Sequence, residues 1–337
     1  MAFTVVQVDP DPGLEPFAHE QTLLAAAGGT LRLARCTEPA EVAPALADAD
    51  VAWLSWSPPI DRAILERLER CRLVIRWGIG YDQIDAVAAT ELGIAVANSP
   101  TYGTEDVAEH AVALLMASAR RIGWANERMH AGDWPLAEFG TVRRMRGRTL
   151  GILGVGRIGS AVARRALGLG LRVIGHDIAK SDDELRAIGV EPVDLAGLIT
   201  GSDYVSVHVP YSAANHHLVD EAFLRAMRPG AILVNTSRGR VLDQPAVGRA
   251  LHDGRLAGAG LDVFETEPLP ADDPIRGAPN VILTAHHAGY SDDAIVDLRA
   301  EMCRTTIDFI TTGWSDAIVN PAVRDRLRPP EIGRAHV

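Results

Sequence analysis

The sequence has few of the features that mark secreted, membrane-bound or nucleic-acid-binding proteins. Its three cysteines, Cys36, Cys71 and Cys303, are odd in number and lack metal-binding spacing, which favours a reducing compartment. Only 33 basic residues stand against 44 acidic ones, and a net charge of −11 argues against binding to nucleic acid or anionic lipid. The chain shows neither a signal-peptide pattern at its start nor an apolar run long enough to span a bilayer. We therefore expect a cytoplasmic protein that binds neither membranes nor nucleic acid.

Short apolar runs alternate with amphipathic stretches along the whole chain, without repeats or low-complexity segments. At 337 residues, 47% hydrophobic and 23% charged, the composition is that of a folded protein with two domains. Uninterrupted apolar runs suit strands buried on both faces, so the alternation predicts an α/β fold with parallel sheets. The expected strands are 4–8, 31–34, 51–54, 73–75 and 94–97, followed by 149–155, 172–175, 204–209, 231–235, 258–263 and 281–284.

Three helices follow from apolar residues spaced three to four apart. One is predicted over 60–69, and another over 292–311. A long helix is predicted from Thr104 through Arg121 and on toward Met129. Its apolar face is large for its length, so we expect another domain or subunit to cover it; the residues of that face are Val107, Ala111, Leu114, Leu115 and Ala119.

The strongest local signal is a glycine-rich turn, Gly154-Val-Gly156-Arg-Ile-Gly159, directly after an apolar strand. Gly154 permits a tight turn, Gly156 lets the backbone approach a pyrophosphate, and Gly159 lets a helix pack closely on the strand. Asp177 ends the next strand, 18 residues after Gly159, where a carboxylate accepts hydrogen bonds from the adenine ribose. The alternative for Asp177 is an ordinary turn aspartate. Because a carboxylate there would repel a 2′-phosphate, the sequence predicts NAD rather than NADP.

Three later strands are each followed by a residue suited to keto-acid chemistry. Arg238 follows the first of them, Glu265 and Glu267 follow the second, and His286 and His287 follow the third. The carboxyl ends of parallel strands meet at one edge of a sheet, where ligands bind. An arginine there binds a substrate carboxylate and polarises a carbonyl, a histidine supplies a proton, and a carboxylate orients the imidazole.

These motifs occur in the order typical of the D-isomer-specific 2-hydroxyacid dehydrogenases, and the sequence resembles that family from about residue 50 to residue 320. NHHLV at 215–219 and HHAGYS at 286–291 look most like the branch of the C-terminal-binding proteins, which are NAD-dependent transcriptional co-repressors. The stretches that carry the family resemblance are RWGIGYDQIDAVAATELGIAVAN, VAEHAVALLMASARR, LGILGVGRIGSAVARRALGLGLRVIGHD, GAILVNTSRGRVLD, GAGLDVFETEP and PNVILTAHHAG.

The resemblance implies a specific domain organisation. A Rossmann NAD-binding domain, 103–291, would be inserted in a flavodoxin-like substrate domain made of 1–102 and 292–330, both with parallel sheets. It also implies a homodimer formed through the helix after Thr104. The last seven residues, EIGRAHV at 331–337, match the translation of a common sequencing-library adapter, so we predict that they are a non-native tail.

The resemblance further implies residue roles. Arg238 would bind the substrate, Glu267 would pair with the histidine, and His286 would be the general acid/base. The backbone amides of Ile79 and Gly80 would hold the substrate carboxylate. Asp262 would lie near the nicotinamide, and the residues implied to bind the cofactor are Gly154, Gly156, Arg157, Ile158, Gly159, Asp177, Val209, Pro210, Thr236 and Asp262.

Two residues depart from the family pattern: Ala285 stands where the family usually has proline, and Gly289 where the co-repressor-like branch often has tryptophan. Two assignments keep an alternative, because His287 could replace His286 and Glu265 could replace Glu267.

Other polar groups are interpreted as structural. The arginines at 143, 144, 146 and 148 suit a solvated loop better than a phosphate-binding patch. His110 is expected to serve interdomain packing, and the histidines at 208, 216 and 217 to be structural or exposed. No metal site is predicted.

The sequence thus predicts an NAD-dependent dehydrogenase that interconverts a small 2-keto acid and its D-2-hydroxy acid. Two alternatives remain: an NADH-sensing, co-repressor-like binding protein on the same fold, and a phosphite- or formate-type dehydrogenase.

Overall fold

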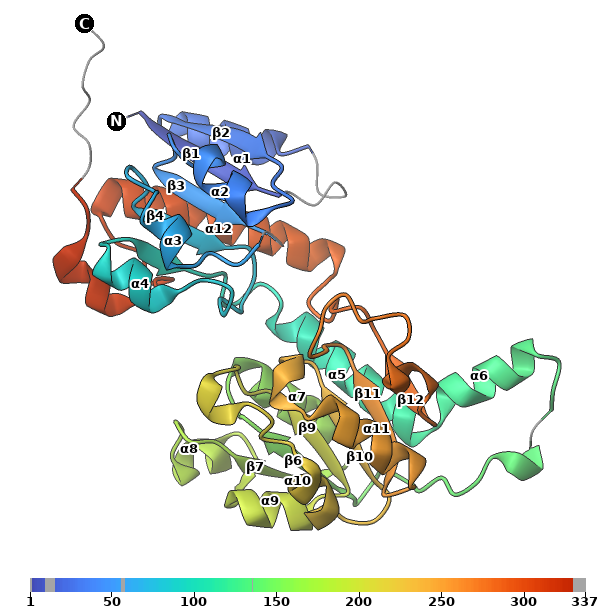
Figure 1. The fold of residues 1–337 in the computed structure, drawn as a ribbon. Coiled ribbons are helices and arrows are strands. Elements are labelled where there is room, and N and C mark those ends of the chain that lie inside the picture. Colours follow the sequence, from blue (N-terminus) through green and yellow to red (C-terminus); the bar gives the residue numbers. More distant parts are fainter. Residues whose placement is uncertain (1, 10–15, 56–57, 135, 330–337) are drawn as a thin grey trace, which may run out of the picture. The chain divides into compact units, whose positions relative to one another are not determined.

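The computed structural model describes residues 2–9, 16–55, 58–134 and 136–329, and the predicted non-native tail lies outside these ranges. The chain forms two compact units (Figure 1). Unit 1 comprises the residues up to Gly103 and those from Ser291 on, and unit 2 is Thr104–Tyr290. The boundaries expected from the sequence had placed Gly103 and Ser291 in the inserted domain; both fall in unit 1.

Unit 1 is built on a sheet of five parallel strands in the order β2-β1-β3-β4-β5. With the strands numbered along the chain, this is the doubly wound order of flavodoxin. Nearly every side chain of the three middle strands is buried, which explains their uninterrupted apolar sequences. The strands are β1 Phe3–Val8, β2 Gly29–Ala34, β3 Val51–Leu54, β4 Leu73–Arg76 and β5 Ala95–Ala97.

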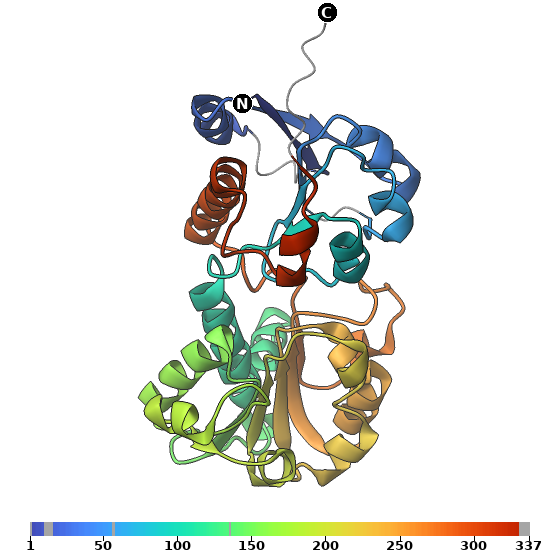
Figure 2. The same cartoon turned by 90° about the vertical axis from the view of Figure 1, so that its left-hand side faces the viewer.

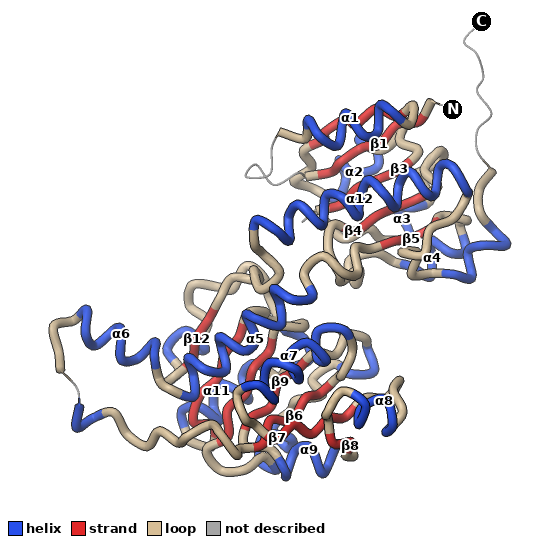
Figure 3. Tube along the Cα trace, turned by 180° about the vertical axis from the view of Figure 1, so that it is seen from behind, coloured by secondary structure: helices blue, strands red, loops and turns tan. Residues whose placement is uncertain are grey.

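Helices cover both faces of the unit 1 sheet. Helices α1 (Ala18–Ala26) and α12 (Asp292–Thr312) share one apolar core with it, so the chain returns to unit 1 after completing unit 2 (Figure 3). The opposite face is covered by α2 Pro39–Ala45, α3 Arg62–Leu65 and α4 Ala86–Glu91. A short 3-10 helix, η6 (Pro321–Arg326), packs against α4 and β5.

Unit 2 contains a sheet of seven parallel strands in the order β12-β11-β10-β9-β6-β7-β8. The chain starts in the middle, runs to one edge and then crosses to the other side, as in a Rossmann fold. The strand order reverses between β6 and β9, and open α/β sheets bind ligands at the carboxyl ends of the strands beside such a reversal. The strands are β6 Thr149–Leu153, β7 Arg172–His176, β8 Glu191–Pro192, β9 Tyr204–Val207, β10 Ala231–Asn235, β11 Leu256–Leu261 and β12 Val281–Leu283.

Helices also flank both faces of the unit 2 sheet (Figure 2). One core contains side chains of α5 (Thr104–Ala119), α7 (Arg157–Gly168) and α8 (Asp182–Ala187). The other contains those of α9 (Leu195–Gly201), α10 (Glu221–Ala226) and α11 (Gln244–His252). The remaining elements are α6 Ile122–His130 and the 3-10 helices η2 Leu136–Glu138, η3 Ala213–Asn215, η4 Gly239–Val241 and η5 Pro274–Gly277.

The helix predicted over 60–69 is much shorter in the structure. Only α3 is α-helical, and its amino end is capped by Asp61, whose Oδ1 accepts a hydrogen bond from the Ile64 amide at 2.9 Å. Ile60 instead forms a parallel β-bridge with Ile84.

The long helix predicted after Thr104 breaks into two. α5 ends at Ala119, Arg121 adopts a left-handed conformation with φ +52°, and α6 begins at Ile122. A left-handed residue cannot continue a right-handed helix, so the chain changes direction there.

The apolar face of α5 is covered within unit 2, which corrects the expectation that another domain or subunit covers it. α5 packs against α7, β10 and β11. Its approach to β11 needs a glycine, because a Cβ at Gly260 would lie 2.7 Å from Leu114 Cβ. Among the described residues, no helix is both long and apolar enough to cross a membrane.

Candidate active site

All predicted site residues of unit 2 follow the carboxyl ends of its strands. Because the strands are parallel, these ends share one edge of the sheet, the edge at which ligands bind in open α/β sheets. The glycine turn follows β6, Asp177 follows β7, and Val209 and Pro210 follow β9. Thr236 and Arg238 follow β10, Asp262 and Glu267 follow β11, and His286 follows β12.

The glycine turn leaves room for a bound pyrophosphate. Gly154 has φ +88°, and a Cβ there would lie 2.9 Å from the carbonyl carbon of His208. A Cβ at Gly159 would lie 2.2 Å from the Gly154 oxygen, whereas one at Gly156 would meet nothing within 4 Å. The α7 helix starts at Arg157, so the amides of its first turn, including that of Ile158, have no acceptor one turn back along the helix. These amides and the open space above Gly156 fit a dinucleotide phosphate.

Asp177 joins the glycine turn to the turn after β7. Its Oδ2 accepts a hydrogen bond from the Val155 amide at 2.7 Å, and its Oδ1 accepts from the Ala179 and Lys180 amides at 2.8 and 3.2 Å. The side chain is thereby held at the carboxyl end of β7, partly exposed, where an adenine ribose would lie. Asp177 is therefore both a structural part of the turn and a suitable acceptor for ribose hydroxyls.

Thr236 also fits a cofactor, because its hydroxyl is buried and has no hydrogen-bond partner among the described residues. A buried polar atom of this kind needs a partner. Val209 is half-buried and Pro210 is exposed beside the same edge. Burial lowers the pKa of the nearby His208 to about 4, so that ring is neutral near pH 7 and cannot act as an acid.

His286 and Glu267 form a pair. The Nδ1 atom of His286 lies 2.6 Å from Oε2 of Glu267, and the other carboxylate oxygen accepts a hydrogen bond from the Phe264 amide at 2.9 Å. Each side chain is 31% exposed, so the pair is reachable from solvent. A carboxylate at Nδ1 fixes the orientation of the imidazole and leaves Nε2 to face a substrate.

Glu265 has a different environment. Its Oε1 accepts a hydrogen bond from the Gln244 amide at 2.9 Å, at the start of α11, and lies 3.0 Å from Nε2 of His217. Its own amide donates to the Gln244 side chain at 3.1 Å. Glu265 thus anchors α11, and the geometry favours Glu267 as the partner of His286.

The turn that carries Arg238 is organised by Asn235. Asn235 Oδ1 accepts from the Ser237 amide at 3.0 Å, and its Nδ2 donates to the Arg238 carbonyl at 2.9 Å. Arg238 Nη1 donates to the Ser237 carbonyl at 2.7 Å. A Cβ at Gly239 would lie 1.8 Å from the Phe264 carbonyl carbon, so this turn packs directly on the segment leading to Glu267.

Asp262 is fully buried and holds the loop that contains His286. Its Oδ1 accepts from the His287 amide at 3.1 Å and from the Thr284 hydroxyl at 2.6 Å, and its Oδ2 accepts from the Ala288 amide at 2.9 Å. His110 Nε2 lies 3.0 Å from the Thr284 hydroxyl. These contacts of His110 lie within unit 2.

Sequence reasoning did not single out Thr284 and gave His110 no part in the site. Thr284 is the first polar residue after the apolar run of β12, and its position at a carboxyl strand end was the available signal. His110 could be linked to it only through the packing of α5 on the sheet.

Ile79 and Gly80 belong to unit 1, in the loop after β4. The Ile79 carbonyl accepts from Asn98 Nδ2 at 2.6 Å, and the Gly78 carbonyl accepts from the Ser99 amide at 3.0 Å. Within the described part of the chain, the amides of Ile79 and Gly80 have no acceptor. They are therefore available to an anion.

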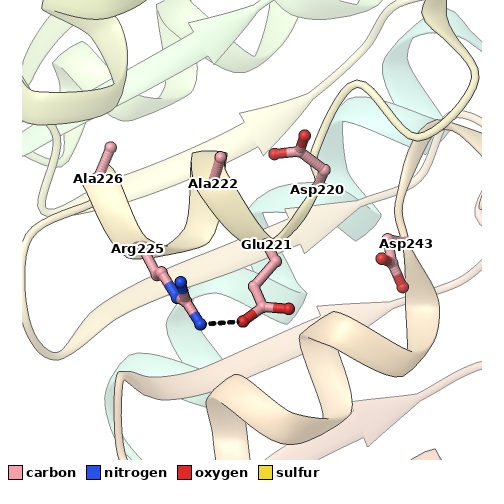
Figure 4. Close-up of a pocket in the computed structure, with 6 residues that line it drawn as sticks. All are labelled: Asp220, Glu221, Ala222, Arg225, Ala226 and Asp243. Carbon is pink, nitrogen blue, oxygen red and sulfur yellow. Dashed lines mark hydrogen bonds and ion pairs between the residues drawn. The ribbon is translucent and has the colours of Figure 1, made fainter.

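A surface hollow beside α10 is lined by none of the predicted site residues (Figure 4). Two of its acidic residues cap helices: Asp220 accepts from the Phe223 amide and Asp243 from the Ala246 amide. The arginine-rich segment before β6 lines another hollow. There Arg148 pairs with Asp203 at 3.1 Å.

Comparison with known proteins identifies the family. The model of the D-isomer specific 2-hydroxyacid dehydrogenase, NAD binding domain, matches residues 112–288. A glyoxylate reductase of Korarchaeum cryptofilum is 42% identical over 286 residues, which cover 84% of this chain and 86% of that protein. The chain belongs to the D-isomer specific 2-hydroxyacid dehydrogenases.

Solved structures agree with this assignment. A glyoxylate reductase from Paecilomyes thermophila superposes with a TM-score of 0.85 at 27% identity, over 95% of this chain and 99% of that one. A D-lactate dehydrogenase from Aquifex aeolicus, solved with NAD and lactic acid, gives a TM-score of 0.83 at 29% identity over 94% and 99%. This 2-hydroxyacid dehydrogenase is thus an NAD-dependent oxidoreductase with a Rossmann domain, as predicted from the sequence.

Proposed function

We propose that this dehydrogenase reduces glyoxylate and related small 2-keto acids to 2-hydroxy acids with NADH, giving the D-isomer where the product is chiral. The observation that carries the proposal is the 2.6 Å contact between His286 and Glu267, at the same sheet edge as Arg238 and the glycine turn. Glyoxylate is named first because relatives of 38 to 42% identity bear the name glyoxylate reductase.

Each residue of the proposed catalytic set has a distinct part. Arg238 binds the substrate carboxylate and stabilises negative charge that develops on the carbonyl oxygen. His286 donates a proton from Nε2 to that oxygen, and Glu267, held by the Phe264 amide, keeps the ring oriented and stabilises its charged form. Bound NADH supplies the hydride that reduces the carbonyl carbon.

The cofactor would be held by the glycine turn, with Arg157 and Ile158 at the amino end of α7. Asp177 would bind the adenine ribose. Val209, Pro210 and Thr236 would line the remainder of the site, and Asp262 would lie near the nicotinamide. The amides of Ile79 and Gly80 would bind the substrate carboxylate.

A formate-type reaction is less well supported, because oxidation of formate to carbon dioxide transfers a hydride and requires no proton donor. The His286–Glu267 pair would then have no chemical task. A co-repressor-like sensor would likewise need NADH binding but no acid/base pair. Phosphite oxidation adds water and needs a base, so the assay includes phosphite.

The test is NADH oxidation with glyoxylate, pyruvate, a branched-chain 2-keto acid and 2-ketogluconate, alongside NAD reduction with formate and phosphite. We expect turnover with at least one keto acid, glyoxylate foremost, and its loss in His286→Asn. His287→Asn is the matched control and should keep activity. NADH binding without any turnover would favour the sensor, and turnover of formate or phosphite alone would overturn the proposal.

We also propose that the protein is a homodimer, formed through α6 and the segment after it rather than through α5. No residue of α6 is buried, and four apolar side chains here are about half or more exposed: Ile122 54%, Met129 49%, Trp134 80% and Leu136 82%. Ion pairs also link this part of the chain, because Arg128 pairs with Asp133 at 2.9 Å and with Glu138 at 3.1 Å. An exposed apolar surface of this kind is typical of subunit interfaces.

The cysteines bear on the cellular compartment of the protein. The three cysteines are free and buried, and burial raises the pKa of Cys71 and Cys303 to about 12. Thiols of this kind suit a reducing compartment, and we propose that the protein is cytoplasmic.

A further inference from the structure

The loop carrying His286 wraps around a buried carboxylate. His286 has φ +51°, and this left-handed residue turns the next two amides, those of His287 and Ala288, toward the side chain of Asp262. The His286 amide itself donates to the Asp262 carbonyl at 2.8 Å. Successive amides around an anion form a backbone nest. The conformation of His286 therefore depends on Asp262 remaining in place to accept these hydrogen bonds.

The position of Asp262 is in turn fixed by the Thr284 hydroxyl, at 2.6 Å from Oδ1. The other hydrogen bonds to this carboxylate come from backbone amides, and His110 Nε2 lies 3.7 Å from Oδ1, so the carboxylate acts as an acceptor. Thr284 must donate its single proton to Asp262, because two oxygens 2.6 Å apart would otherwise repel. The hydroxyl oxygen can then only accept from its second neighbour.

That second neighbour is His110, whose Nε2 lies 3.0 Å from the Thr284 hydroxyl. His110 must therefore carry its proton on Nε2. Burial lowers the pKa of His110, which favours the neutral form with a single ring proton. The chain of donors runs in one direction, from His110 to Thr284 to Asp262.

We propose that His110 and Thr284 are positioning residues that hold His286 in place through Asp262; this rests on the proposed role of His286. The alternative is a metal site, since ligand atoms of His110, Asp262 and His287 all lie within 4.8 Å of one another. The hydrogen bonds argue against it, because Nε2 of His110 is protonated and three donors occupy the Asp262 oxygens. His287 instead packs its ring edge-on against His110, with centroids 5.2 Å apart.

The first experiment compares Thr284→Val, which keeps the shape but loses the hydroxyl, with Thr284→Ser, which retains it. Two quantities are measured: kcat for keto-acid reduction, and hydrogen exchange of the His287 and Ala288 amides. We expect Thr284→Val to lower kcat by at least ~10-fold, because small misplacements of catalytic groups have large effects. Its loop amides should exchange about tenfold faster. Thr284→Ser should lie within about twofold of wild type in both measurements, since the donor is kept.

The second experiment tests whether His110 acts through Thr284. His110→Leu should lower kcat about as much as Thr284→Val. The double variant should be no worse than either single one, because each single substitution already interrupts the series of hydrogen bonds from His110 to Asp262. His110→Gln, whose amide can donate to Thr284, should recover most of the loss. Ser118→Ala is the control: its buried hydroxyl on the same helix has no partner among the described residues.

The outcomes separate this proposal from the proposed function. Additive losses in the double variant, or equal losses in Thr284→Ser and Thr284→Val, would overturn the positioning role. If Thr284→Val does not fold, the comparison of His110→Leu with His110→Gln decides the same question. A wild-type protein that reduces no keto acid would refute the proposed function, whereas the exchange of the His287 and Ala288 amides would still test the positioning.

Discussion

The left-handed backbone of His286 shows how much one residue can depend on its surroundings. A non-glycine residue at φ +51° is uncommon and persists only where neighbouring contacts require it. Here the contacts come from Asp262. Its carboxylate accepts hydrogen bonds from the amides of His287 and Ala288, and its carbonyl accepts one from the amide of His286. Sequence could predict that His286 lies beside a carboxylate at the sheet edge. It could not predict the backbone conformation, which depends on a residue 24 positions earlier in the chain.

Arg238→Lys is expected to impair the enzyme badly although the charge is retained. A guanidinium contacts carboxylate and carbonyl oxygens together in a fixed plane, whereas an ammonium is a point charge. We expect a loss of at least ~3 kcal/mol of transition-state stabilisation, in the range found for removing an electrophilic donor. The measurement is kcat/KM for the best keto acid, with circular dichroism to verify folding. A folded variant with nearly normal kcat/KM would show that Arg238 is structural.

Substitution of Glu267 should affect catalysis, whereas substitution of Glu265 should affect stability. Glu267→Gln removes the charge beside His286, so kcat should fall by about 10²-fold while the melting temperature changes little. Glu265→Gln weakens the contacts that hold α11, so it should lower the free energy of unfolding by about 1 kcal/mol with kcat nearly unchanged. Steady-state kinetics and thermal unfolding of both variants provide the comparison. Should Glu265→Gln be the inactive variant, the histidine's partner has been assigned wrongly.

Among the elements, the strands were predicted better than their ends. The runs 149–155, 204–209 and 258–263 each extend two residues beyond the strands that the structure contains. The extra residues include Val155 and Val263, which are buried in loops; burial keeps a loop residue apolar, so composition alone cannot mark where pairing ends. β8, only two residues long, was not predicted, because so short a strand has no periodicity.

The turn after β7 determines the expected choice of cofactor. Asp177 presents a carboxylate where a 2′-phosphate would bring like charge, so NADH should be preferred by at least ~100-fold in kcat/KM, or ~2.7 kcal/mol. Asp177→Ala should narrow this gap. It should also weaken NADH binding, because the contact with the Val155 amide is lost. Lys180→Ala is a control on the same turn. Equal efficiency with NADPH in the wild-type protein would contradict the assignment.

For the whole molecule, the alternation of apolar runs and amphipathic stretches predicted two α/β domains, because this periodicity can be read from the sequence alone. The insertion of one domain in the other was implied only by the resemblance to the family. The sequence could not show which partner covers an apolar helix face. The face of α5 looked like a subunit interface, yet α7, β10 and β11 cover it within unit 2. Conversely, the exposed apolar residues near α6 lie in a short helix and an irregular segment, where no regular spacing distinguishes them from a buried face.

Measurement of the oligomeric state tests the proposal that a homodimer forms through α6 and the segment after it. We expect a dimer at micromolar concentration by light scattering, and a shift toward monomer when Trp134→Asp and Leu136→Asp are combined. Those side chains are 80% and 82% exposed, and an interface that buries them gains about 25 cal/mol per Å² of apolar surface, which two carboxylates would oppose. Val87→Asp, at a position 70% exposed in unit 1, is the matched control and should leave the dimer intact. A wild-type monomer, or a dimer that only Val87→Asp dissociates, would show that the segment around α6 is not the interface.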